Sequence, residues 1–282
     1  MYASIDIEVA ESFDETKKDD GSFVHPPHQL PISCAAIAVY TESEGINVSS
    51  FGIDYKMNPA QVRELVGTLS ILSSMGCPIV TWNGVGFDFR CLEFWAKQGL
   101  PQFAARLWSE EAIFLARNHI DPGFLMMCQF GYMIGLNTCA QALGVEGKLE
   151  GMSGKLAPLL WSGLTGQEND DTLKEIANLG TVPGSLQARN LCLDYVKQDA
   201  ITTLEVYLAL KNLHPLGGIR WTTLRGNISR TAWIPERDMN GDLLSVLEAN
   251  SLPQPDTSWM RNPPRERSEY ISWTEASVSN HS

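Results

Sequence analysis

The sequence predicts an α/β fold in which a mixed β-sheet is flanked by helices. Three strand patterns open the chain, at residues 3–9, 32–40 and 46–53, and the turn between the second and third indicates an antiparallel meander. A helical pattern, an apolar strand at 79–82 and a second helical pattern follow. This order of three strands, a helix, a strand and a helix suits a sheet that has helices on both faces.

The first two helices begin and end with typical signals. The first is predicted over residues 60–74, because Asn58 offers a capping side chain and Pro59 suits the first helical position. Apolar residues recur in it at helical spacing, at Val62, Leu65, Val66, Leu69 and Leu72. The second helix is predicted over residues 87–97 and is ended by Gly99.

The region that follows is predicted to be mostly helical. Residues 101–153 include a short capped helix at 137–143, and another short helix is expected at 156–161. Residues 165–185 are rich in loop-forming residues, so we interpret them as an insertion with one short helix. A long helix is predicted from about residue 186 to 210. Within 101–153, the Met-rich stretch Phe124–Phe130 is interpreted as core, and His119 as a residue that packs and bonds locally.

Four acidic residues lie where they can share one site. Asp6 and Glu8 are two residues apart in the first strand, so both point to one face of the sheet. Asp88 lies at the start of the helix after the fourth strand, and Tyr195 and Asp199 lie four residues apart on the apolar face of the long helix. A carboxylate that faces the interior is unfavourable unless it is paired or holds a metal. We therefore expect the four acids to converge on a pair of divalent cations, for which magnesium or manganese is suited.

These residues form three motifs that resemble those of the DEDD 3′-5′ exonucleases of the tyrosine subtype (DEDDy). The motifs are Asp6-x-Glu8, Asn83-x-x-x-Phe87-Asp88 and Tyr195-x-x-x-Asp199. Over roughly residues 1–211, the chain is similar to stand-alone bacterial exonucleases related to the proofreading domain of family B DNA polymerases. Three further segments resemble that subfamily before the last helix, namely His119-Ile120-Asp121, Gly144-x-x-x-Lys148 and Met152-Ser153-Gly154. One departure is Val9, where many relatives carry Thr.

The resemblance implies a ribonuclease-H-like fold and hydrolysis of phosphodiester bonds from the 3′ end of single-stranded DNA or RNA, with release of nucleoside monophosphates. The cofactors would be two Mg²⁺ or Mn²⁺ ions per site. By the resemblance, Asp6 would bridge both ions. Glu8 and Asp199 would hold the ion on the side of the attacking water, and Glu8 would also touch the terminal 3′-hydroxyl. Asp88 would act mainly through water bound to the other ion.

The remaining site residues implied by the resemblance would contact the water or the substrate. Tyr195 would orient the attacking water, because a phenol with a pKa of about 10 is neutral and more suited to position water than to deprotonate it. Asn83 and Phe87 would border the terminal nucleotide, by hydrogen bonding and by packing. Lys148 could bind a phosphate; the alternative is a surface lysine on a loop.

Composition restricts the class of partner. The net charge of −12 argues against an extended grip on nucleic acid, but not against catalysis at a strand end. No apolar run reaches transmembrane length, and the six cysteines are scattered without a CxxC pair, which is typical of a cytoplasmic protein with reduced thiols. The expected partner is the 3′ end of a single-stranded nucleic acid, not a membrane; a separate polymerase or repair protein is a further candidate.

Two alternatives to the exonuclease stay open at this point. The first is a catalytically inactive nucleic-acid-binding module that retains the fold. The second is an endonuclease of the ribonuclease H class, against which Tyr195 speaks, because it fits a site for a free 3′ end. The presence of all four acids favours an active enzyme over an inactive module.

The C-terminal part of the chain differs in composition from the rest. We expect residues 1–211 to form the exonuclease domain and residues 212–282 to form a Trp/Arg-rich extension that packs on the core and has a flexible end. Residues 217–234 are expected to fold back as a hairpin or loop. Arginines and tryptophans alternate here as in single-strand binders, at Arg220, Trp221, Arg225, Arg230 and Trp233. We favour the simpler interpretation that the tryptophans, with Trp259 and Trp273, anchor the extension.

Overall fold

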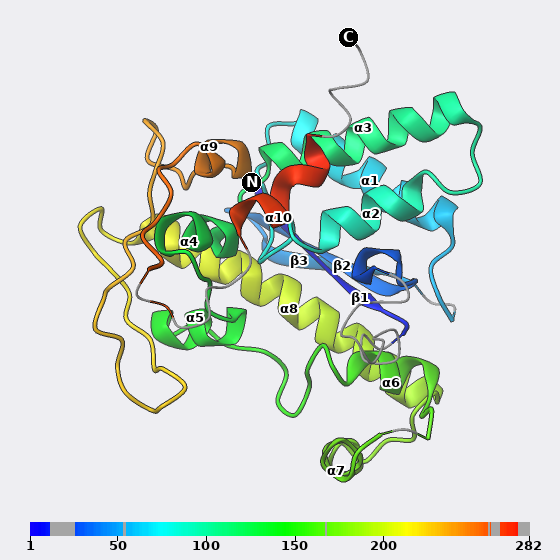
Figure 1. The fold of residues 1–282 in the computed structure, drawn as a ribbon. Helices are drawn as coiled ribbons and strands as arrows, with labels where there is room; N and C mark the ends of the chain where they lie inside the picture. The colour runs from blue at the N-terminus through cyan, green and yellow to red at the C-terminus, as the bar shows by residue number, and fades with distance from the viewer. Residues whose placement is uncertain (12–25, 53–54, 167, 259, 261–265, 276–282) are drawn as a thin grey trace.

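The computed structural model contains a mixed sheet between two layers of helices (Figure 1). It describes residues 1–11, 26–52, 55–166, 168–258, 260 and 266–275. Within this part of the chain, the sheet has the strand order β3-β2-β1-β4. The strands are β1 (Tyr2–Val9), β2 (Ile32–Thr41), β3 (Gly45–Phe51) and β4 (Ile79–Val80). The prediction of an α/β fold with a mixed sheet flanked by helices is confirmed.

The central strand β1 directs apolar side chains to one face of the sheet and polar side chains to the other. It pairs antiparallel with β2 and parallel with β4, and β2 pairs antiparallel with β3, so the predicted meander is confirmed. Because side chains alternate along a strand, Ile5 and Ile7 point to one face and Ser4, Asp6 and Glu8 to the other. Ile5 and Ile7 belong to one of two buried apolar clusters. Both acidic residues of β1 are thereby directed away from that cluster.

Three helices cover the face of the sheet that carries Ile5 and Ile7 (Figure 1). They are α1 (Pro59–Ser74), α2 (Asp88–Ala96) and α3 (Gln102–Asn118). As predicted, α1 begins at an Asn58 cap, whose side chain accepts hydrogen bonds from two N–H groups of the first turn in a capping box. The second helix begins at Asp88 instead of Phe87, because Phe87 has φ −136° and ψ −68°, outside the helical region.

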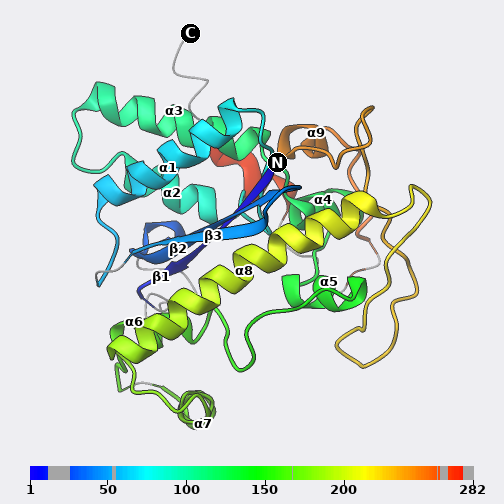
Figure 2. The same ribbon diagram turned by 180° about the vertical axis from the view of Figure 1, so that it is seen from behind.

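The long helix α8 (Leu186–Asn212) crosses the opposite face of the sheet (Figure 2). Small side chains allow its close approach: Ala36 and Ala38 on β2 are fully buried, and Ser4 Oγ on β1 donates a hydrogen bond of 2.6 Å to the carbonyl of Ala200. The helices around α8 are α4 (Pro122–Phe130), α5 (Leu136–Leu143) and α6 (Ala157–Ser162). Side chains of β1 and α8 can therefore share one site.

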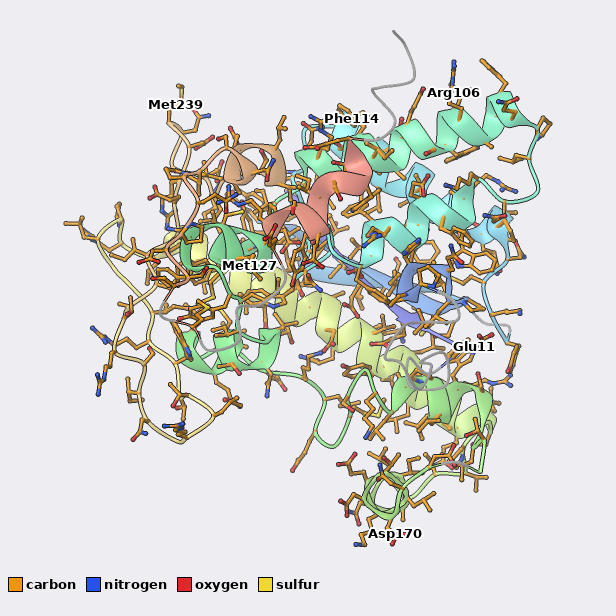
Figure 3. The ribbon with its side chains drawn as sticks, viewed as in Figure 1. Glu11, Arg106, Phe114, Met127, Asp170 and Met239 are labelled. Atoms are coloured by element: carbon orange, nitrogen blue, oxygen red, sulfur yellow. The ribbon has the colours of Figure 1, made fainter. Side chains whose placement is uncertain are left out.

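The helices predicted in the second half of the core are present, with ends shifted by one or two residues. The expected single helix in residues 165–185 is α7 (Asp170–Asn178). Figure 3 shows Asp170 on α7, away from the sheet, and Met127 on α4. Met127 is buried, so the interpretation of the Met-rich stretch as core is correct.

The described part of the C-terminal extension packs on α4 and α8. Bridges Ile219↔Trp233 and Thr222↔Ile228 form the expected hairpin. Trp233 is fully buried and its Nε1 donates a hydrogen bond of 2.8 Å to Gln129 Oε1 on α4. Short helices α9 (Val246–Asn250) and α10 (Arg267–Ile271) and the 3₁₀ turn η3 (Ser272–Thr274) follow.

Three arginines of the extension, Arg220, Arg237 and Arg267, bind backbone carbonyls. Arg237 donates hydrogen bonds to the carbonyls of Leu210, Lys211 and Leu213 at the end of α8, which satisfies groups that the helix leaves open. Trp259 and the expected flexible end lie outside the described residues. The division of the chain at residue 211 stays a prediction. None of the helices in the described ranges combines the length and apolar character needed to cross a membrane.

Candidate active site and metal centre

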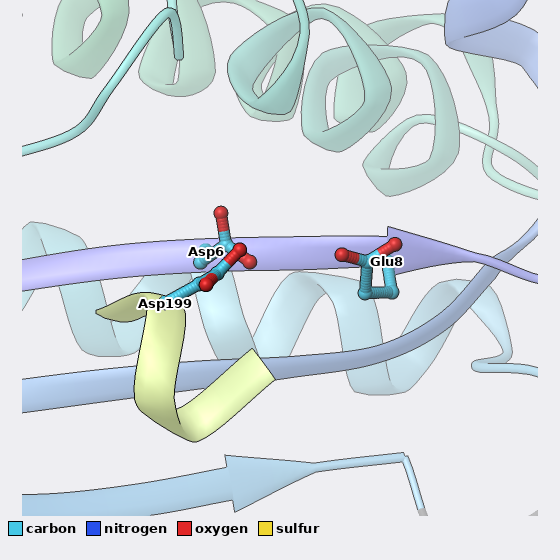
Figure 4. Close-up of side chains that lie close together, drawn as sticks. All are labelled: Asp6, Glu8 and Asp199. Carbon is cyan, nitrogen blue, oxygen red and sulfur yellow. The ribbon is translucent and has the colours of Figure 1, made fainter. Parts of the chain in front are cut away.

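Three carboxylates from β1 and α8 converge at the centre of the sheet (Figure 4). Each of Asp6, Glu8 and Asp199 offers an oxygen, and these oxygens all lie within 4.8 Å of one another. Glu8 and Asp199 are buried, and Asp6 is partly exposed as a residue although its Oδ2 is buried. The strand period and the close approach of α8 bring these groups together.

The donor set fits a divalent cation with a preference for oxygen ligands. Asp6 Oδ2 and Asp199 Oδ1 are buried, and neither has a hydrogen-bond partner among the described residues. A buried carboxylate oxygen is normally hydrogen-bonded or bound to a metal. Carboxylates alone, without thiolate or imidazole, suit magnesium or manganese. Asp6, Glu8 and Asp199 are thus the residues that could hold such an ion.

Electrostatics in the cluster favour the neutral form of each carboxyl. Burial raises the pKa of Asp6 well above its usual value, and the charges of Asp199, Asp88 and Glu8 raise it further. Burial and the charge of Asp199 raise the pKa of Glu8 to about 8. The pKa of Asp199 is also raised by burial, although Lys148 acts against this shift. Carboxylates this crowded need protons or a cation.

Asp88 lines the same cavity but lies outside the cluster of three. As the first residue of α2, it accepts a hydrogen bond of 3.2 Å from the N–H of Ile7 through Oδ1. Burial raises the pKa of Asp88 to about 7, and the hydrogen bonds from its own N–H and from Ile7 act in the opposite direction. The position is compatible with a less direct role than that of Asp6, Glu8 and Asp199.

Tyr195 and Lys148 border Asp199 on the side of α8. Lys148 Nζ donates hydrogen bonds to Asp199 Oδ2 at 2.5 Å and to Tyr195 OH at 2.9 Å. Burial acts to lower the pKa of Lys148, but the charges of Asp199 and Asp6 outweigh it and raise the pKa. Burial, followed by the charges of Glu8 and Asp199, raises the pKa of Tyr195 far above its usual value. Both groups therefore stay protonated near neutral pH.

The turn that carries Asn83 and Phe87 is held by Asp121. Asp121 Oδ1 accepts hydrogen bonds of 2.9 Å from the N–H groups of Asn83 and Phe124, and its Oδ2 accepts one of 3.2 Å from Val85. Asn83 has φ 67°, a left-handed conformation that Asn tolerates better than most residues. Its Oδ1 is buried without a hydrogen-bond partner among the described residues.

His119 supports the same turn through Thr81. Its Nε2 lies 2.9 Å from Thr81 Oγ1, and its Nδ1 lies 2.9 Å from the carbonyl of Ala116. Thr81 Oγ1 in turn accepts a hydrogen bond of 3.1 Å from the N–H of Gly84. The interpretation of His119 as a residue that packs and bonds locally is confirmed.

A single open cavity of about 530 Å³ gathers the predicted site residues. Eight of them line it: Asp6, Glu8, Asn83, Phe87, Asp88, Lys148, Tyr195 and Asp199. Other lining residues that were not predicted include Trp82, Arg90 and Tyr270. Arg90 follows Asp88 by two residues on α2, a spacing that does not place two side chains on one face of a helix, so no local signal predicts it. No local signal connects Tyr270 with this site, because it lies far away in the chain.

Comparison with known proteins supports the fold. Residues 27–210 match a family model described as RNase_H superfamily. The matched range contains the motifs around Asn83 and Tyr195, whereas Asp6 and Glu8 precede it. No curated protein matches the chain. The expected ribonuclease-H-like fold is therefore confirmed, and the DEDDy subtype stays a prediction.

Proposed function

We propose, from the premise that this chain belongs to the RNase_H superfamily, that it is a metal-dependent 3′-5′ exonuclease of the DEDDy type. Its substrate would be single-stranded DNA or RNA, and its products nucleoside monophosphates. Members of the superfamily are generally nucleases that use divalent metals, so a phosphodiester hydrolase is the starting point. The finer proposal concerns the end of the strand that is attacked and the subtype of the site.

The observation that carries the proposal is the convergence of Asp6, Glu8 and Asp199 with Tyr195 in one cavity. Three crowded carboxylates with raised pKa values are unfavourable without a cation. A structural ion pair would not account for the unpartnered oxygens of Asp6 and Asp199 that face this site. A nuclease that binds two divalent ions would use these oxygens as metal ligands.

Each residue of the chain has a definite task in this proposal. Asp6, Glu8 and Asp199 would hold the divalent ions. Asp88, at the start of α2, would act on them less directly. When bound, the ions would supply the positive charge that activates a water molecule and stabilises the leaving 3′ oxygen. Tyr195 would position the attacking water as a neutral phenol, because its raised pKa prevents it from acting as a base.

The substrate would be held on the other side of the cavity. Asn83, which lines the cavity, would hydrogen-bond to the terminal nucleotide. Phe87 would pack against the same nucleotide. Lys148 would reach a phosphate oxygen from its place beside Asp199, because its side chain is 30% exposed.

Degradation of end-labelled oligonucleotides tests the proposal. A single strand labelled at its 5′ end should shorten from the 3′ end in magnesium or manganese, and matched DNA and RNA strands would give the sugar preference. Asp6→Ala should abolish the reaction. Asp194→Ala is the matched control, because Asp194 is an exposed carboxylate on the same helix as Asp199 and does not line the cavity.

A circular single strand separates the exonuclease from the two alternatives. The circle should resist hydrolysis, because it has no 3′ end. Cleavage of the circle would indicate an endonuclease of the ribonuclease H class instead. A gel shift of the linear strand without shortening would indicate an inactive binding module. Either result would overturn the proposal.

A further inference from the structure

The cavity is completed by a segment from the far end of the chain. Tyr270 on α10 lines it together with the turn at residues 82–87. In Figures 1 and 2, α10 lies between α4 and the pair of helices α2 and α3. The C-terminal extension therefore supplies part of the site, although the motifs of the core are complete without it.

Arg267 anchors α10 to α9 and the loop after it, and through one bond to α4 of the core. It is buried, and its guanidinium donates hydrogen bonds to the carbonyls of Asn250 at 2.8 Å, Leu252 at 2.7 Å, Pro253 at 3.0 Å and Cys128 at 3.4 Å. A planar guanidinium with several acceptors fixes the direction of the segment that carries it. Tyr270, one turn along α10, is thereby presented in one place.

Tyr270 lies directly against the turn that carries Asn83. A Cβ added to Gly86 would lie 2.7 Å from Tyr270 Cδ1, so the ring lies in contact with the backbone of Gly86. Trp273 Nε1 donates hydrogen bonds to the carbonyls of Val85 at 3.0 Å and Tyr270 at 2.9 Å, across 188 residues of sequence in the first case. The ring is thus fixed relative to the turn.

The walls of the cavity differ in chemistry. The strand β1 and the helix α8 supply carboxylates, whereas the turn and α10 supply the aromatic rings of Trp82, Phe87 and Tyr270. The volume of about 530 Å³ is within the range of sites for small ligands. A nucleotide has the matching division, since its phosphate suits the carboxylate-bound cations and its base has a flat face that stacks on aromatic rings.

We propose that Tyr270 binds the substrate by stacking against the base of the 3′-terminal nucleotide. The inference rests on the proposed exonuclease function and adds a residue from the extension to its substrate site. Stacking tolerates all bases, so the contact would hold the end of any single strand without selecting its sequence.

Steady-state kinetics on single strands test the inference. Tyr270→Ala should raise KM by about ten-fold or more, as expected for one lost stack, and leave kcat near that of the wild type. Tyr270→Phe keeps the ring and should stay within about two-fold in KM. Tyr132→Ala is the matched control, because Tyr132 is a half-buried tyrosine that packs on Trp221 of the extension and does not line the cavity.

A substrate without the terminal base distinguishes stacking from a structural role. On a strand that ends in an abasic nucleotide, wild type and Tyr270→Ala should have equal KM values, because no base is present to stack. A KM increase of the same size on normal and abasic ends would overturn the inference, as would an unchanged KM on normal ends. If the wild type hydrolyses no strand at all, the exonuclease proposal fails first and the inference with it.

Discussion

Lys148 Nζ lies 2.5 Å from Asp199 Oδ2, so an ammonium group already stands at the edge of the carboxylate cluster. The side chain of Asp199 is 2% exposed and that of Lys148 is 30% exposed. One ammonium does not neutralise the site, because burial and the neighbouring charges still raise the pKa values of Asp6 and Glu8. The cluster is therefore still unfavourable without a further cation. The predictions for the metal-free protein depend on this.

Removal of the ammonium should destabilise the metal-free protein. Lys148→Met leaves the buried Asp199 without its cation, and we expect a loss of about 1–2 kcal/mol, less than for a fully buried pair because Lys148 is partly exposed. Thermal unfolding in EDTA measures it. Magnesium should recover most of the loss. Lys197→Met, which breaks the more exposed Lys197–Asp194 pair, is the control; equal losses in both variants would contradict the prediction.

The metal-free protein should become less stable as the pH rises from about 5 to about 8. Burial first, and then Asp199, raises the pKa of Glu8 to about 8, and burial raises that of Asp88 to about 7. In this window the folded state binds protons that the unfolded state has released, so stability falls with pH. The stabilising contribution is complete below the unfolded pKa values and lost above the folded ones.

The melting temperature against pH in EDTA measures this dependence. Glu8→Gln should have a shallower slope, because the side chain no longer titrates. Magnesium should flatten the dependence of the wild-type melting temperature on pH, because the bound metal displaces the protons from the carboxyls. A melting temperature that rises with pH in EDTA over this range would show that the carboxyls are not protonated in the folded state.

The motifs predict from sequence which side chains share a face of a strand or a helix, because each motif depends on local geometry. Asp6 and Glu8 share a face through the strand period, and Tyr195 and Asp199 share one through the helix period. These rules place a side chain on an element, and the small residues Ala36 and Ala38 on β2 allow α8 to approach the sheet closely. Neither period predicts that β1 and α8 lie side by side, so tertiary packing decides that the three carboxylates converge.

The residues that sequence reasoning missed are those placed by tertiary contacts. Tyr270 reaches the cavity through the anchoring of α10 by Arg267, a contact between carbonyls and a guanidinium that has no sequence period. The strand expected at 79–82 ends at Val80, because Thr81 begins a turn by accepting a hydrogen bond from Gly84. Long-range contacts thus place Tyr270, whereas a local side-chain hydrogen bond ends the strand.

Asp6→Asn should abolish hydrolysis and also stabilise the metal-free protein. The amide keeps the shape of the side chain but removes a buried charge that Asp199, Asp88 and Glu8 repel. We expect a melting temperature above that of the wild type in EDTA at pH 8, because active sites accept destabilising groups for function. Asp194→Asn should change neither activity nor melting temperature. A less stable Asp6→Asn protein would mean that the carboxylate has a structural partner.

Asp121 should support the substrate side of the site without affecting its metal side. Asp121→Ala leaves the backbone N–H groups of Asn83, Val85 and Phe124 without their acceptor, and we expect a loss of about 2–4 kcal/mol in the free energy of unfolding. Urea denaturation measures the loss. The KM for single strands should rise because Asn83 and Phe87 are displaced. Manganese binding, measured by calorimetry, should stay as in the wild type, since the cluster is held by β1 and α8.

Asp238→Ala is the matched control for Asp121→Ala. Asp238 also accepts hydrogen bonds from backbone N–H groups, those of Asn240 and Asp242, but in a surface turn of the extension. Loss of manganese binding in Asp121→Ala would show instead that the turn and the carboxylate cluster form one cooperative unit.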